Sequence, residues 1–166
     1  EAVRRLEAYH AAHPLRFTMP REELRSGLGL GAREFPAILG GLAPEVVAAG
    51  DGVARAGWTP APPPPLAAQI EAAASAIEAG GLQPPRVPLD AEVQAYLEAS
   101  GRIVDCGDGV LLGAQVFETA RARIVAALRE RGALSLAEVR DLLDTNRLNA
   151  QAVLETLDRQ GVTRRQ

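Results

Sequence analysis

The residues that could take part in catalysis are few, and the sequence does not group them into a site. His10 and His13, the only two histidines, lie three residues apart on one expected helix, with no cysteine or carboxylate cluster fixed beside them. Cys106, the only cysteine, falls in an expected hairpin strand, where a small packing residue is the simpler interpretation. All 18 basic residues are arginine, which excludes a P-loop lysine and a Schiff-base lysine. We therefore expect no catalytic residue, no metal site and no cofactor in this chain.

The charge is unevenly distributed along the chain. The net charge is −3, which weakly disfavours general nucleic-acid binding. Residues 61–120 contain two arginines and eight acidic residues, whereas residues 121–166 contain nine arginines and six acidic residues. If the protein binds a polyanion, we expect the contact in the last third of the chain.

The segment from Arg140 to Asn149 combines a turn signal with cations. Thr145 or Asn146 can cap a helix that begins next, and the N–H groups and positive dipole end of such a helix favour a phosphate. The candidate nucleic-acid-binding residues are Arg140, Thr145, Asn146, Arg147, Asn149, Gln151, Arg164 and Arg165. The alternative to a binding site is that these residues only form a solvent-exposed helix face beside a frayed chain terminus. The pattern alone does not separate RNA from DNA, because both present phosphates.

The first part of the chain has the signals of one small module. Apolar periodicity and turn residues predict three helices followed by a β-hairpin, with Asp-Gly in the turn. The predicted elements are helices over 3–13, from Pro20 onward and over 32–42, and strands over 45–49 and 53–58.

A proline-rich stretch follows this module. Residues 60–65 contain five prolines in six positions. Because proline lacks the N–H that helix interiors and sheets require, we interpret this stretch as a stiff, extended linker rather than an ordinary surface loop.

Two further units follow the linker. The predicted elements are a helix from Leu66 that Gly80-Gly81 ends, a helix over 89–99, a hairpin over 102–112, a helix from near Val116, a helix that Ser135 caps, and a helix after Thr145. Ser135 and Glu138 have the spacing of a capping box. The Gly-Asp-Gly-Val of the first hairpin, at 50–53, recurs at 107–110, which indicates related units. The middle unit has little room for a second helix.

Each unit approximates the helix, helix, helix, hairpin order of a winged helix. We therefore predict a mainly α fold with small β-hairpins (α+β), built from tandem winged-helix modules. The predicted domains are a winged helix at 1–59, a linker at 60–65, a short winged helix at 66–113, and a winged helix at 114–166 whose C-terminal hairpin is truncated. No apolar stretch is long enough to cross a membrane, and we expect a cytoplasmic monomer.

Two pairs of segments resemble a known family. Leu136–Arg147 and Leu154–Arg165 closely resemble the last winged helix of bacterial selenocysteine-specific elongation factors, the SelB family. Tyr9–Arg16 and Met19–Arg25 resemble an earlier winged helix of the same family, and the resemblance spans nearly the whole chain.

The resemblance implies a four-module winged-helix arm attached to a GTPase. Residues 1–59 would be the second module. The final module would bind the mRNA stem-loop (SECIS) that recodes UGA, while absent domains would bind GTP with Mg, the selenocysteinyl-tRNA and the ribosome. By position, Thr145, Asn146 and Arg147 would contact the hairpin, with the remaining arginines of the candidate set nearby. The chain itself would not be an enzyme.

The sequence departs from the family at two points. Asn146-Arg147-Leu148 stands where the family usually has Ser-Arg-Lys, which removes one cation. A Gly-Asp and a further basic strand usually follow the paired arginines, and the sequence ends at Gln166. Each missing phosphate contact lowers the logarithmic salt dependence of RNA binding by about 0.7–0.9.

Two other functions are compatible with the pattern. A winged helix with an arginine-bearing helix-turn-helix is also typical of DNA-binding transcription regulators. The acidic middle module, with Arg86 and Arg102 as its only cations, is compatible with an architectural spacer without nucleic-acid affinity.

Overall fold

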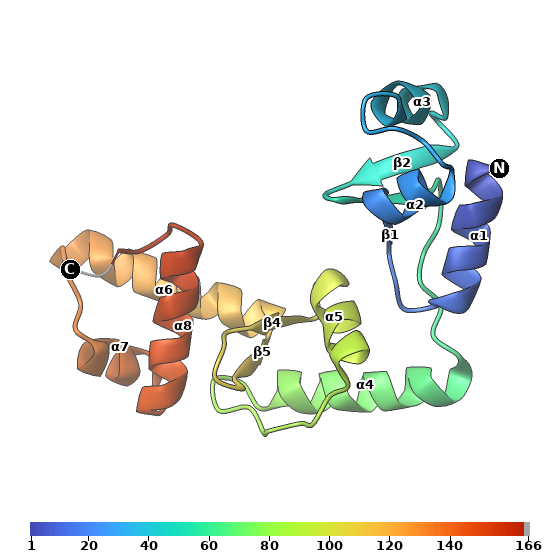
Figure 1. Ribbon diagram of the computed structural model, residues 1–166. Helices are drawn as coiled ribbons and strands as arrows, with labels where there is room; N and C mark the ends of the chain where they lie inside the picture. Colours follow the sequence, from blue (N-terminus) through green and yellow to red (C-terminus); the bar gives the residue numbers. More distant parts are fainter. Residues whose placement is uncertain (165–166) are drawn as a thin grey trace. The chain divides into compact units, whose positions relative to one another are not determined.

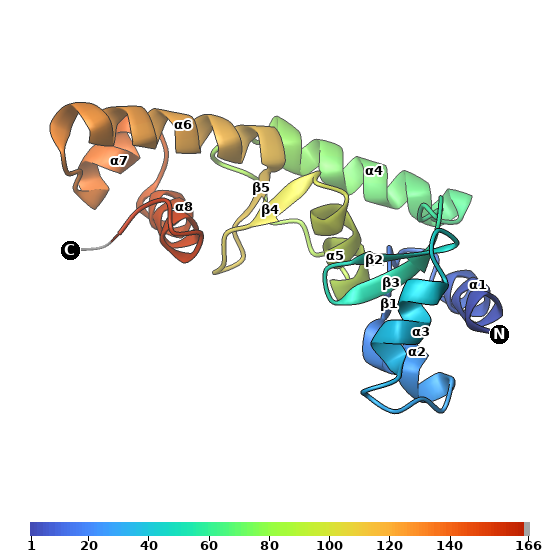
Figure 2. The same cartoon turned by 90° about the horizontal axis from the view of Figure 1, so that it is seen from above.

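The computed structural model describes residues 1–164, and the chain divides between Ala67 and Ala68 into two compact units. Helices predominate, and the strands form two small antiparallel sheets (Figure 1, Figure 2). The structure therefore confirms the predicted fold class, mainly α with small hairpins.

Unit 1 has the complete element order of a winged helix. Its elements are α1 (Ala2–Ala12), β1 (Met19–Pro20), α2 (Arg21–Gly27), α3 (Phe35–Gly41), β2 (Val46–Ala49) and β3 (Gly52–Arg55). The sheet order is β1-β3-β2, with Met19 opposite Val53. Gly52 permits the close approach of β1, because a Cβ atom there would lie 2.2 Å from the Oγ1 of Thr18.

One apolar cluster holds unit 1 together. Its buried members come from every layer of the module: Ala2, Leu6, Met19, Leu24, Phe35, Val46 and Val53. Leu6 on α1, Leu24 on α2 and Val53 on β3 are fully buried. The helices thus cover the sheet through the faces that their apolar periodicity predicts.

The start of α2 differs from the prediction. Pro20 was expected at the first helical position, but it pairs with Gly52 in the sheet, and α2 begins at Arg21. The Arg21 N–H donates to the carbonyl of Asp51 at 3.2 Å, so the hairpin turn and the helix start are joined. Pro20 suits this place because its fixed φ is compatible with an edge strand.

Only part of the proline-rich stretch serves as a linker, so the linker is shorter than the predicted range 60–65. The N–H of Ala61 donates to the carbonyl of Pro14 at 3.1 Å, which ties the start of the stretch to unit 1. Pro64 and Pro65 begin α4 (Pro64–Ala79). Prolines are tolerated in the first turn of a helix, where the N–H groups have no intrahelical partner.

Unit 2 contains both the middle and the last predicted modules. After α4 its elements are α5 (Ala91–Ala99), β4 (Ile103–Asp105), β5 (Leu111–Gly113), α6 (Ala114–Arg131), α7 (Leu136–Leu143) and α8 (Arg147–Arg159). No helix lies between α4 and α5, which agrees with the short middle module expected from the sequence.

Arg102, directly before β4, ties helix α4 to the hairpin of the middle module. Its Nε donates to Oε1 of Glu78 at 2.7 Å, and its Nη1 donates to Oε2 of Glu71 at 3.0 Å. Both carboxylates lie on α4, so Arg102 is a structural residue of the middle module.

The middle hairpin belongs to the core of the last module. Gly113 ends β5 and is also the N-cap of α6, so no loop separates the two modules. The shared core contains Cys106, Val110 and Leu112 from the hairpin region, together with residues of α6, α7 and α8: Phe117, Ala120, Ile124, Val139, Leu143, Ala150, Ala152, Val153 and Leu157. The predicted boundary at 113/114 therefore does not separate two packing units.

Neither a membrane-spanning helix nor a metal-binding cluster occurs within residues 1–164. None of the helices there is long and apolar enough to span a membrane. No group of three or more His, Cys, Asp or Glu side chains in that range is placed to hold a metal ion.

His10 is buried in unit 1 without a hydrogen-bond partner. Its side chain is 2% exposed, neither ring nitrogen has a partner among the described residues, and the ring stacks on Trp58 at a centroid distance of 4.3 Å. The Nε1 of Trp58 donates to the carbonyl of Arg16 at 2.9 Å, which fixes the indole. Burial lowers the pKa of His10 below its ordinary value of 6.5.

This burial predicts that acid destabilises unit 1. The unfolded chain takes up a proton at His10 below about pH 6.5, whereas the folded unit resists protonation, so stability is present above that pH and is lost as the pH falls through the lower folded pKa. Urea unfolding followed by the fluorescence of Trp58, the only tryptophan, should show a lower midpoint at pH 5 than at pH 7. His10→Phe should remove most of this pH dependence; an equal dependence in both proteins would contradict the explanation.

Candidate nucleic-acid interface

The helix-turn-helix of the last module begins with the predicted capping box. The Glu138 N–H donates to Oγ of Ser135 at 3.2 Å, and the Ser135 N–H donates to Oε2 of Glu138 at 2.8 Å. This exchange satisfies two N–H groups at the start of α7 that have no intrahelical partner. The structure therefore confirms the cap that the sequence predicts.

The turn between α7 and α8 is set by two local features. Asp144 adopts the left-handed conformation, with φ 50° and ψ 53°, and ends α7. Asn146 is the N-cap of α8, because its Oδ1 accepts the N–H of Asn149 at 2.9 Å. Of the two capping residues that the sequence offered, the structure selects Asn146.

The buried face of α8 places Arg147 at the surface. Ala150, Val153 and Leu157 are buried in the shared core, as their spacing predicts. Arg147 begins α8 and is exposed, and no carboxylate within residues 1–164 pairs with its guanidinium. An exposed cation beside the positive end of a helix is a suitable contact for a phosphate.

Two other predicted residues have side chains that already hold a partner. Both Nε and Nη2 of Arg140 donate to Oδ1 of Asp141, at 2.8 and 2.6 Å, so its charge is locally compensated. The Nε2 of Gln151 donates to Oε1 of Glu155 at 2.9 Å. Arg164 is exposed after the end of α8. Arg165, also predicted, lies outside the described residues.

The side chains of Thr145 and Asn149 point toward the middle module. Oγ1 of Thr145 donates to the carbonyl of Leu82 at 2.6 Å, and Nδ2 of Asn149 donates to the same carbonyl at 2.8 Å. Asn149 is 6% exposed. The donors of these two residues are therefore used within the protein, which the sequence pattern did not indicate.

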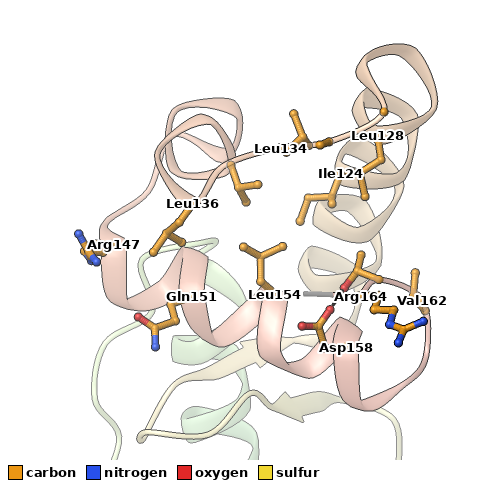
Figure 3. A pocket seen from close by; sticks show the side chains of 14 residues that line it. Ile124, Leu128, Leu134, Leu136, Arg147, Gln151, Leu154, Asp158, Val162 and Arg164 are labelled. Atoms are coloured by element: carbon orange, nitrogen blue, oxygen red, sulfur yellow. Dashed lines mark hydrogen bonds between the residues drawn. The ribbon is translucent and has the colours of Figure 1, made fainter. Parts of the chain in front are cut away.

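A groove runs along α8 between Arg147 and Arg164. It has a volume of about 570 Å³ and is lined by Ile124, Leu128, Gly132, Ala133, Leu134, Leu136, Val139, Arg147, Gln151, Leu154, Asp158, Val162, Thr163 and Arg164. Figure 3 shows Arg147 and Arg164 at opposite ends and Leu154 between them. The groove thus has an apolar floor with a cation at each end.

Sequence reasoning missed several residues that shape this interface. Leu154 packs against the shared core and also lines the groove. Arg123 of α6 donates through Nη2 to the carbonyl of Leu142, near the end of α7. Leu148 is 42% exposed beside Arg147. This exposure and the contacts of Leu154 and Arg123 depend on how α6, α7 and α8 pack, so no local sequence signal marks them.

Cys106 has the environment of a packing residue. It is 2% exposed, and burial raises the pKa of its thiol to about 11. A thiol with such a pKa is protonated at neutral pH and is a poor nucleophile. This agrees with its interpretation as a core residue.

The fold and the interface define a class of protein. Unit 1 is a winged helix, and unit 2 ends in a helix-turn-helix, so the chain is a tandem winged-helix protein. The exposed Arg147 and Arg164 form what we call the cationic face of unit 2.

Family comparison gives the particular assignment. Residues 3–45 match the second winged-helix model, and residues 126–166 the third, of the family described as elongation factor SelB, winged helix. The two matches together span half of the chain, which belongs to the winged-helix region of this family. Residues 126–166 match the model of the third winged helix, whereas the sequence resemblance pointed to the last winged helix of the family. No curated protein matches the chain.

The capping role of Asn146 predicts a specific stability change. Asn146→Ala should lower the unfolding free energy of unit 2 by about 1 kcal/mol, because the Asn149 N–H loses its acceptor. Asn146→Asp, which keeps an acceptor oxygen, should be close to the wild type. Urea unfolding followed by far-UV circular dichroism measures this change, and Trp58 fluorescence serves as the unit 1 control. An unchanged midpoint in Asn146→Ala would contradict the assigned cap.

Proposed function

We propose that unit 2 binds an mRNA hairpin next to a UGA codon, as part of the winged-helix arm of a selenocysteine-specific elongation factor. The family comparison supports a role in selenocysteine-specific elongation. In this proposal the arm recruits the GTPase, with its GTP and Mg, and the selenocysteinyl-tRNA, through domains outside this sequence. The chain itself performs no catalysis, and it acts as a cytoplasmic monomer.

The observation that carries the proposal is the position of Arg147. It is exposed at the first position of a 13-residue helix that Asn146 caps, and no carboxylate in residues 1–164 compensates its charge. The positive end of the helix dipole and the guanidinium therefore act at the same point on an anion. Arg164 supplies a second cation across the groove.

The distribution of charge favours a short RNA element over a long duplex. Asp141 compensates Arg140, Glu155 accepts from Gln151, and Asp158 lines the groove. These carboxylates interrupt the cationic track that a DNA duplex would need along its phosphates. A hairpin can be bound through contacts to a few phosphates, while an unstacked loop or bulge base packs against an apolar surface such as the groove around Leu154.

Replacement of Arg147 tests the contact. Arg147→Ala should weaken binding to a bulged RNA hairpin by about tenfold or more, since a charge-assisted hydrogen bond contributes about 1.5 kcal/mol or more. The slope of log K against log salt should decrease by about 0.7–0.9. Fluorescence anisotropy at several salt concentrations measures both effects.

Arg33→Ala is the matched control, because Arg33 is also exposed but lies in unit 1. It should leave hairpin affinity and the salt slope nearly unchanged. If both substitutions have the same small effect, binding is nonspecific and the proposed contact is wrong.

A further inference from the structure

The carbonyl of Leu82 accepts two hydrogen bonds from the last module. Its donors are Oγ1 of Thr145 at 2.6 Å and Nδ2 of Asn149 at 2.8 Å. A carbonyl oxygen has two lone pairs, so these contacts fill its capacity. A third, longer contact joins Nε2 of Gln83 to the carbonyl of Asp144 at 3.4 Å. The middle module therefore contacts the turn between α7 and α8.

The turn that presents this carbonyl is stiff. Gly81 has φ of 57°, which favours glycine. A Cβ atom on Gly80 would lie 2.7 Å from Cα of Pro84 and 2.6 Å from Cδ of Pro85, so the chain folds back closely on this residue. The Gln83 N–H also donates to the carbonyl of Gly80 at 3.0 Å. The Leu82 carbonyl is thus held in place by its own turn.

We propose that Thr145 and Asn149 are positioning residues, which anchor the start of α8 on the Leu82 carbonyl and so direct Arg147 and Gln151 toward RNA. This inference rests on the proposed function. It gives the middle module a role in recognition, since its 80–85 turn sets the direction of a helix in the last module.

The geometry favours positioning over direct contact. Asn149 is 6% exposed, and one of its two Nδ2 hydrogens is already donated to the Leu82 carbonyl, so little of its amide is accessible to RNA. Arg147 lies two residues after Thr145 and two residues before Asn149, which is in the first turn of α8. A tilt of α8 that follows loss of the anchor therefore moves Arg147 directly.

A double-mutant cycle on the full chain tests the inference. The variants are Thr145→Val, which removes the donor; Thr145→Ser, which keeps it; Gly80→Ala, which displaces the turn; and Thr145→Val with Gly80→Ala. Ile70→Val, a buried substitution on α4, is the control for a general loss of stability. Affinity for a bulged RNA hairpin is measured by anisotropy, and local opening by amide hydrogen exchange.

We expect Thr145→Val and Gly80→Ala each to weaken RNA binding roughly three- to tenfold, as loss of one hydrogen bond allows. The double variant should bind RNA only slightly less tightly than the single variant with the larger loss of affinity, because both changes remove the same anchor. Thr145→Ser and Ile70→Val should bind like the wild type. Hydrogen exchange should accelerate at 145–149 in Gly80→Ala.

Three results would overturn the inference. If Thr145→Val weakens binding while Gly80→Ala does not, Thr145 contacts the RNA itself. Additive effects of the two changes, or unchanged exchange at 145–149 in Gly80→Ala, would show that the turn does not position α8. If the wild type binds no hairpin, the proposed function fails, and the exchange data alone decide whether the anchor exists.

Discussion

The structure of unit 2 depends on one shared apolar core. Leu112 of the middle hairpin and Phe117 of α6 are buried together with Val153 and Leu157 of α8. Because Gly113 joins β5 directly to α6, the hairpin cannot move away from this core without unfolding the start of α6. Burial of this apolar surface is the main favourable term that orders the last module, and it fixes which face of α8 remains outside.

The polar contacts around this core set the finer geometry. Oγ1 of Thr156 lies 2.8 Å from the carbonyl of Ala152 and 3.3 Å from the carbonyl of Cys106, so its single hydrogen is shared between α8 and the hairpin near one end of the helix. The Leu82 carbonyl holds the other end of α8 through Thr145 and Asn149. A buried polar group without a partner costs free energy, so the arrangement that forms these hydrogen bonds is favoured. Because apolar packing itself is nondirectional, these contacts fix the orientation of α8. The cationic face is therefore defined by both modules of unit 2.

Local features of this structure could be predicted from the sequence, whereas its long-range contacts could not. The capping box at Ser135 and the buried positions of α8 follow from spacing within one or two helical turns. The bond from Asn149 to Leu82 joins residues 67 positions apart, and no local pattern marks it. The same reason explains why the shared core and the groove around Leu154 emerged only from the structure. The sequence proposed candidate residues for the site, but it could not show which of their side chains already have partners within the protein.

We propose that the cationic face of unit 2 recognises a particular RNA shape. The most direct measurement is an anisotropy titration of the full chain with a bulged hairpin from beside a UGA codon, a scrambled hairpin and a DNA duplex, each at several salt concentrations. The account predicts tighter binding to the hairpin than to either control at every salt concentration, because shape and loop contacts persist when phosphate contacts are screened. Equal affinity for all three probes, or preference for the duplex, would contradict it.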